Sequence, residues 1–74
     1  MSDIILPGDY GVGTMGFDAT DSGYRKAADH LVQLDNQGYH IDTSDYEVQR
    51  VMNLFGASDI STLRTQRSAG WYPW

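Results

Sequence analysis

The stretch that decides the fold is SDYEVQRVMNLFG, residues 44–56, because it holds a helix start, a helix face and a helix stop in register. Ser44 and Glu47 match a capping box, in which each side chain bonds to the backbone N–H of the other residue. The apolar side chains that follow recur at helical spacing and would form one stripe: Val48, Val51, Met52 and Phe55. Gly56 ends the pattern, since a residue without a Cβ most easily adopts the left-handed conformation that terminates a helix.

Residues 22–37 predict a second amphipathic helix that packs against the first. Its cap is supplied by Thr20, Asp21 or Ser22. Gly38 stops it, and Tyr39 is placed to fold back on Leu34 in a Schellman-type end. The link 38–43 has only six residues, a length typical of antiparallel or crossing helix pairs, so we expect a helical hairpin.

A third, shorter helix is expected from a cap at Ser58 or Asp59 to about Arg67. The order helix, Gly56-Ala57-Ser58, helix is similar to a helix-turn-helix. The side chains that such a motif would present to a DNA groove are Ser61, Thr62, Arg64, Thr65 and Arg67. The net charge of −5 and the position of Asp59 both oppose binding to phosphate, so nucleic acid is an unfavoured partner.

The N-terminal residues 1–20 predict an extended, glycine-rich arm outside the packed core. Residues 11–16 match G-x-G-x-x-G, but neither a strand directly before the motif nor a helix directly after it is expected, which disfavours a dinucleotide site. The apolar patch Ile4, Ile5 and Leu6, together with Met15 and Phe17, would give the arm its contact points.

Side chains that could bind a metal or act in catalysis are present, but their spacing does not match that of a metal or catalytic site. Residues 18–29 can be aligned with a calcium loop that has Gly23 at its turn, but two of the ligands would be hydroxyls and no helix precedes it. A helix cap is the simpler interpretation. His30 and His40 lack the spacing of a metal pair, and His30 is expected on a helix flank as a solvated or half-packed side chain. We therefore predict a protein that is not an enzyme, with no catalytic residue, metal, cofactor or small-molecule substrate.

Composition restricts the class of protein further. The chain has 74 residues and no cysteine, which indicates one small domain without a disulfide framework. No apolar run is long enough to cross a bilayer, and no signal peptide is expected, so we predict no membrane association. The expected location is the cytoplasm or a particle assembled inside the cell.

The C-terminal tail, residues 68–74, places three aromatic side chains in its last four positions: Trp71, Tyr72 and Trp74. These side chains either cover a thin core or anchor the chain in another protein, since Trp and Tyr dominate binding hot spots. The predicted fold is all-α: an arm at 1–20, a three-helix domain at 21–67 and an aromatic tail.

This architecture favours a non-enzymatic protein-interaction or assembly subunit, for example a minor structural component of a large particle such as a virion. Its partner would be another protein or further copies of the chain, and the predicted contact residues are Ile4, Ile5, Leu6, Met15, Phe17, Trp71, Tyr72 and Trp74. Two alternatives stay open. One is a small acidic inhibitor that uses the carboxylates of residues 3–21 with Asp42, Asp45 and Glu47 to occupy a basic site, and the other is the helix-turn-helix DNA-binding protein.

Overall fold

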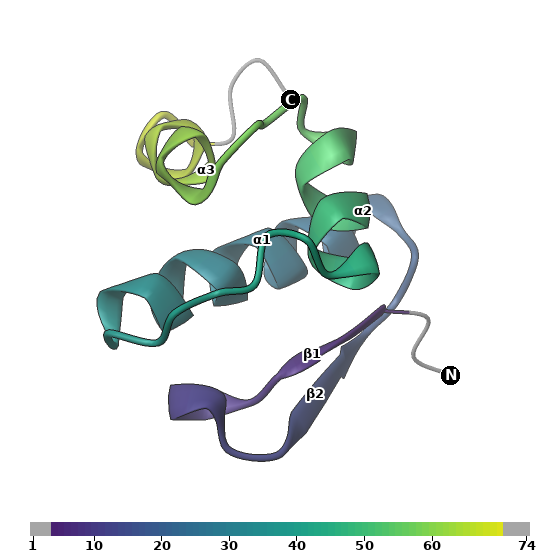
Figure 1. Cartoon of the computed structure of the whole chain (residues 1–74). Helices are drawn as coiled ribbons and strands as arrows, with labels where there is room; N and C mark the ends of the chain where they lie inside the picture. The colour runs from purple at the N-terminus through teal and green to yellow at the C-terminus, as the bar shows by residue number, and fades with distance from the viewer. Residues whose placement is uncertain (1–3, 71–74) are drawn as a thin grey trace.

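The N-terminal part of the chain forms a β-hairpin. The computed structural model describes residues 4–70 and places β1 (Ile4–Pro7) antiparallel to β2 (Thr14–Phe17). A short 3₁₀ turn, η1 (Asp9–Gly11), lies in the connection between them (Figure 1). The prediction of an all-α fold with an extended N-terminal arm is therefore wrong, and the domain is a mixed α/β unit.

The three predicted helices are present as α1 (Asp21–Asn36), α2 (Tyr46–Leu54) and α3 (Ile60–Ser68). Thr20 caps α1 by accepting a bond from the backbone N–H of Gly23 at 3.0 Å. At the other end of α1, Tyr39 N–H donates to the Leu34 carbonyl at 3.0 Å, and the intervening Gly38 has a φ of 84°. This is the predicted Schellman end, which the left-handed conformation of Gly38 makes possible.

The cap of α2 differs from the predicted capping box. The side chain of Asp45, rather than that of Ser44, accepts bonds from the backbone N–H groups of Glu47 and Val48. Ser44 instead donates both its backbone N–H and its hydroxyl to Asp42. Serine and aspartate both cap helices well, so the local sequence allows either Ser44 or Asp45 as the cap. Because Ser44 is bonded to Asp42 in the preceding turn, Asp45 is the residue that caps α2.

The core lies where α1 meets the hairpin, α2 and α3. Figure 1 shows α1 in the middle of the molecule, with the hairpin on one side and α3 on the other. Of the hairpin side chains, Ile4 and Leu6 are fully buried, and Phe17 packs against the same cluster. The remaining buried apolar side chains are Ala27, Ala28, Leu31, Val32, Leu34, Ile41, Val48, Val51, Met52, Phe55, Ala57, Ile60 and Leu63. The first strand thus supplies part of the core that the helices alone would lack.

His30 joins α1 to β1. Its side chain is only 5% exposed, so the prediction of a solvated or half-packed side chain is wrong. The Nε2 atom lies 2.6 Å from the carbonyl oxygen of Pro7, and because a carbonyl only accepts, Nε2 carries the proton. The ring also lies against Phe17, with 5.6 Å between the ring centroids. This histidine is therefore a structural link between the helix and the hairpin.

We expect His30→Leu to reduce the free energy of unfolding by about 1–3 kcal/mol, because the Pro7 carbonyl loses the donor that satisfies it. Urea denaturation followed by circular dichroism measures the change. His40→Leu is the matched control, since His40 is exposed, and we expect it to change stability by less than about 0.5 kcal/mol. Equal losses in the two variants would contradict a linking role for His30.

The cap of α3 makes the stability of the protein depend on pH. The pKa of Asp59 lies below its ordinary value because its carboxylate accepts bonds from the backbone N–H and then the hydroxyl of Thr62. A lowered pKa in the folded state stabilises the fold above about pH 4, and this contribution is lost as the pH falls through the folded-state pKa. Asp59→Asn keeps a capping side chain without the charge. We therefore expect the melting temperature of the variant to fall less than that of the wild type between pH 7 and pH 3, and an identical fall would contradict this role.

Candidate protein-interaction surface

The connection between the two strands is a well-formed loop, residues 8–13. The backbone N–H of Gly8 donates to the carbonyl of Gly13 at 3.1 Å and closes the loop at its base. Inside it, Gly11 N–H donates to the Gly8 carbonyl at 2.8 Å and Val12 N–H donates to the Asp9 carbonyl at 3.0 Å. The glycines thus lie in a loop that the chain itself orders.

Contacts with the C-terminal end of α1 fix this loop in place. The backbone N–H of Tyr10 donates to the side-chain oxygen of Gln37 at 2.8 Å, and the Gln33 amide donates to Asp9 at 3.3 Å. Gly11 lies directly against Tyr39, so close that a Cβ at this position would come within 2.3 Å of the ring. A larger residue could not occupy position 11 without displacing Tyr39.

Two large side chains extend from the ordered loop into solvent. Tyr10 is 70% exposed and Val12 is 77% exposed. Tyr10 also has a φ of 56°, a left-handed conformation that costs a tyrosine roughly 1 kcal/mol or more. We call Tyr10 and Val12 the hairpin tip. Because both side chains are held out by a fixed backbone, the tip is suited to contact another protein with little further ordering.

The predicted contact residues are divided between core and surface. Ile4 and Leu6 are buried within the chain, where no partner can reach them, and Phe17 is partly buried against the core. Ile5 and Met15 are exposed. They extend from opposite faces of the hairpin, since Ile5 pairs with Gly16 rather than with Met15. The structure therefore does not bring the five hairpin residues together, and Trp71, Tyr72 and Trp74 lie outside the described residues.

An apolar groove of about 240 Å³ lies beside the hairpin, between β1 and the segment that joins α1 to α2. Its apolar lining is Ile5, Pro7, Leu34, Tyr39, Ile41 and Val48, with Asp42 and Asp45 also at its wall. Pockets for cofactors and drug-sized ligands are larger, at about 300–1,000 Å³. The groove is therefore of a size to receive one or two side chains rather than a whole small molecule.

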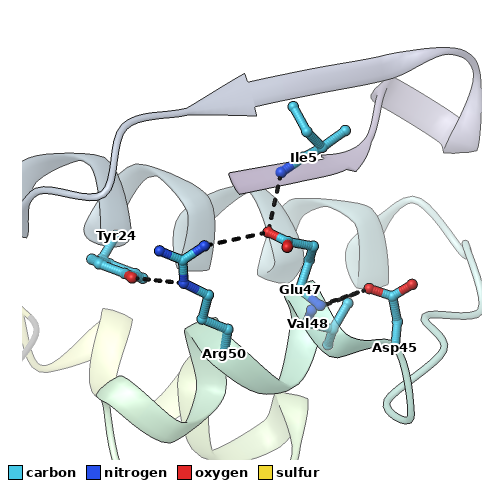
Figure 2. Close-up of polar contacts among 6 residues, drawn as sticks. All are labelled: Ile5, Tyr24, Asp45, Glu47, Val48 and Arg50. Atoms are coloured by element: carbon cyan, nitrogen blue, oxygen red, sulfur yellow. Dashed lines mark hydrogen bonds and ion pairs between the residues drawn. The ribbon is translucent and has the colours of Figure 1, made fainter. Parts of the chain in front are cut away.

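Polar contacts join β1 to α2, and α2 to α1, beside this groove. Figure 2 shows the Glu47 carboxylate between the backbone N–H of Ile5, at 3.4 Å, and the guanidinium of Arg50, at 3.9 Å. Arg50 Nε also donates to the Tyr24 hydroxyl at 3.0 Å, and this bond is the main reason that the pKa of Arg50 is raised. One outward-facing backbone group of β1 thereby has an acceptor within the chain.

The arginines of the third helix face α1. Arg64 forms an ion pair with Asp35 and donates to the side chain of Asn36, while Arg67 forms an ion pair with Asp29. Both arginines are partners of acidic residues on the neighbouring helix, so they are not arranged as a phosphate-binding face. This placement does not favour the helix-turn-helix alternative.

The sequence motifs for small ligands have other structural explanations. The G-x-G-x-x-G stretch begins in η1 and continues into β2, so no helix follows it as a phosphate site would need. Thr20 and Gly23, from the calcium-like stretch, form the cap of α1. Within residues 4–70, no group of three or more His, Cys, Asp or Glu side chains could hold a metal ion. Across the same residues, no helix has the length and apolar character needed to span a membrane.

Comparisons with protein-family models, with curated proteins and with solved structures find no match to this chain. The candidate surface is therefore supported only by the exposure and contacts of its residues.

Tyr10 and Val12 are the site residues that the sequence analysis missed. A signal for them exists, because two short runs of strand-forming residues, 4–6 and 14–17, flank a turn-rich stretch with Pro7, Gly8, Gly11 and Gly13. That pattern is typical of a β-hairpin, whose loop must be exposed.

We expect Gly11→Ala to destabilise the protein by more than about 1 kcal/mol, because it adds both a left-handed alanine and a clash with Tyr39. Gly13→Ala is the matched control: its φ is 68°, but no atom lies within 4 Å of the added Cβ. The difference between the two variants in chemical denaturation measures the contact with Tyr39. Equal effects would show that the tip does not depend on that contact.

Proposed function

We propose that this chain is a non-enzymatic protein-interaction subunit that contacts its partner through the hairpin tip. The observation that supports this most is the exposure of Tyr10 and Val12 on a loop whose backbone is held by hydrogen bonds within the loop and to Gln37. Tyrosine is among the residues that dominate binding hot spots, and it contributes a large contact area with few rotatable bonds.

The strain at Tyr10 adds to the argument. A glycine at this position would adopt the same backbone conformation without cost, and the chain has glycines on either side of the position, at 8 and 11. The fold instead tolerates a tyrosine there and leaves its side chain in water. Such an arrangement gives no stability to the isolated domain, which favours a role for the side chain in binding.

The C-terminal aromatics are a second predicted contact, which lies outside the described residues. Membership of a large particle such as a virion stays a prediction from the sequence. The acidic-inhibitor alternative receives less support, because Asp42, Asp45 and Glu47 each accept hydrogen bonds within the chain. In Asp42 the bonds from the Ser44 hydroxyl and backbone hold the pKa below its usual value, so this carboxylate is already occupied.

The test compares Tyr10→Ser with Tyr46→Ser in affinity capture from the native source. Tyr46 is 73% exposed on α2, so the two variants remove similar exposed side chains from different places. We expect Tyr10→Ser to reduce partner capture at least about tenfold, which is the effect of losing one hot-spot side chain, and Tyr46→Ser to leave it unchanged. Val12→Ser should have an intermediate effect.

Equal capture by wild type and Tyr10→Ser would overturn the proposed tip contact. Repeating the capture at about 50 mM and 500 mM salt separates the alternatives, since an acidic inhibitor on a basic site would lose most of its binding at the higher value. Salt-insensitive capture that is abolished by removing residues 71–74, but not by Tyr10→Ser, would assign the contact to the tail instead.

A further inference from the structure

The outer edge of β2 carries backbone groups that point away from the domain. In an antiparallel pair, residues that face each other alternate between bonding to each other and bonding outward. Ile5 N–H donates outward to Glu47, and the Pro7 carbonyl accepts from His30, so both residues direct their backbone groups away from β2. Their cross-strand partners, Gly16 and Thr14, must therefore direct their own N–H and C=O groups away from β1.

The two edges of the sheet differ in how they are covered. Along β1, Glu47 accepts from the Ile5 N–H and His30 donates to the Pro7 carbonyl, whereas Thr14, Met15 and Gly16 of β2 are all exposed. Natural edge strands are usually blunted by a charged residue, a proline or a bulge. Strand β2, with the sequence TMGF, has none of the three.

The distribution of charge along the chain favours a second copy of this chain as the partner of the β2 edge. The chain has a net charge of −5, yet residues 10–17 contain no charged side chain. Copies of such a chain repel each other over most of their surface, and a charge-free edge is where that repulsion is least. Asp9 and Asp18 lie just outside the segment, so an antiparallel copy can align with Thr14 to Gly16 without placing one acid opposite another within residues 12–18.

We propose that two copies of this chain associate by antiparallel pairing of their β2 edges, forming one four-stranded sheet about a two-fold axis. With Met15 opposite Met15 of the second copy, Thr14 of each strand faces Gly16 of the other. Each facing pair exchanges two N–H to C=O bonds, so the register gives four new hydrogen bonds and satisfies all the outward groups of both residues. Asp18 then lies opposite Val12, and the interface is self-complementary as a two-fold contact requires.

This association does not rest on the proposed tip contact, because its backbone bonds are made by Thr14 and Gly16 and Tyr10 takes no part in it. The paired segments are short, so the contact is small and the dimer is weak, with a dissociation constant on the order of 100 µM. Two-stranded sheets are marginal elements, and a third and fourth strand extend the ladder without any rearrangement of the domain. A strand from a different protein would compete for the same edge.

The test uses opposite charges at position 15. In the proposed register the two Met15 side chains form a non-hydrogen-bonded pair, in which the Cβ atoms are about 4.5–5.5 Å apart. Met15→Lys and Met15→Glu should each weaken self-association at least tenfold in sedimentation equilibrium, because like charges face each other. An equimolar mixture of the two variants should associate at least as tightly as the wild type. Tyr46→Lys and Tyr46→Glu, also exposed but distant in sequence from β2, are the controls and should change neither quantity.

A synthetic chain with a methyl group on the Gly16 nitrogen provides a second readout that changes no side chain. It removes one outward donor from each edge, and we expect the same loss of association with an unchanged circular dichroism spectrum. A wild-type protein that stays monomeric up to about 1 mM would overturn the proposal. So would an equimolar mixture of the Met15→Lys and Met15→Glu variants that associates no better than either variant alone, since that result would place the contact elsewhere or assign the edge to another protein.

Discussion

The attachment of the first strand to α1 is the contact on which the rest of this domain depends. Ile4 and Leu6 enter the core, and the His30 side chain donates to the carbonyl at the end of the same strand. A chain of 74 residues buries a modest fraction of its surface, so two fully buried aliphatic side chains are a substantial share of what stabilises it. The hairpin is consequently part of the folded unit and not an appendage to it.

The same attachment leaves the far parts of the hairpin available for binding. β1 is bonded to α2 through the Ile5 N–H and to α1 through the Pro7 carbonyl, whereas the loop side chains Tyr10 and Val12 and most of β2 are exposed. A glycine-rich loop would ordinarily lose much entropy on meeting a partner, but here Gln37 and Tyr39 have already ordered it. His30 and Glu47 hold the first strand on the helices, and Gln37 and Tyr39 fix the loop that carries Tyr10.

The helices could be predicted from the sequence because their signals are local. Gly38 and Gly56 stop helices through backbone conformations that few other residues adopt. The apolar residues from Val48 to Phe55 recur at the spacing of an α-helix and do not alternate as in a strand. The choice between Ser44 and Asp45 as the cap of α2 could not be predicted, because it depends on the turn that Asp42 makes. The hairpin was missed for a different reason. Its strands have four residues each, and what stabilises them is burial in a core formed by residues distant in sequence, together with the bond from His30.

The hairpin tip and the outer edge of β2 belong to one hairpin, so pairing of two edges determines where the two tips lie. In an antiparallel pair of β2 strands, the loop that precedes one strand lies at the opposite end from the loop that precedes the other. A dimer formed through the edge would therefore present its two tips at opposite ends of the shared sheet. Two partner molecules could each occupy one tip, so weak pairing of the edges would link partners already bound at the tips. A low intrinsic affinity suits that arrangement, because the acidic free chains stay apart until a shared assembly raises their local concentration.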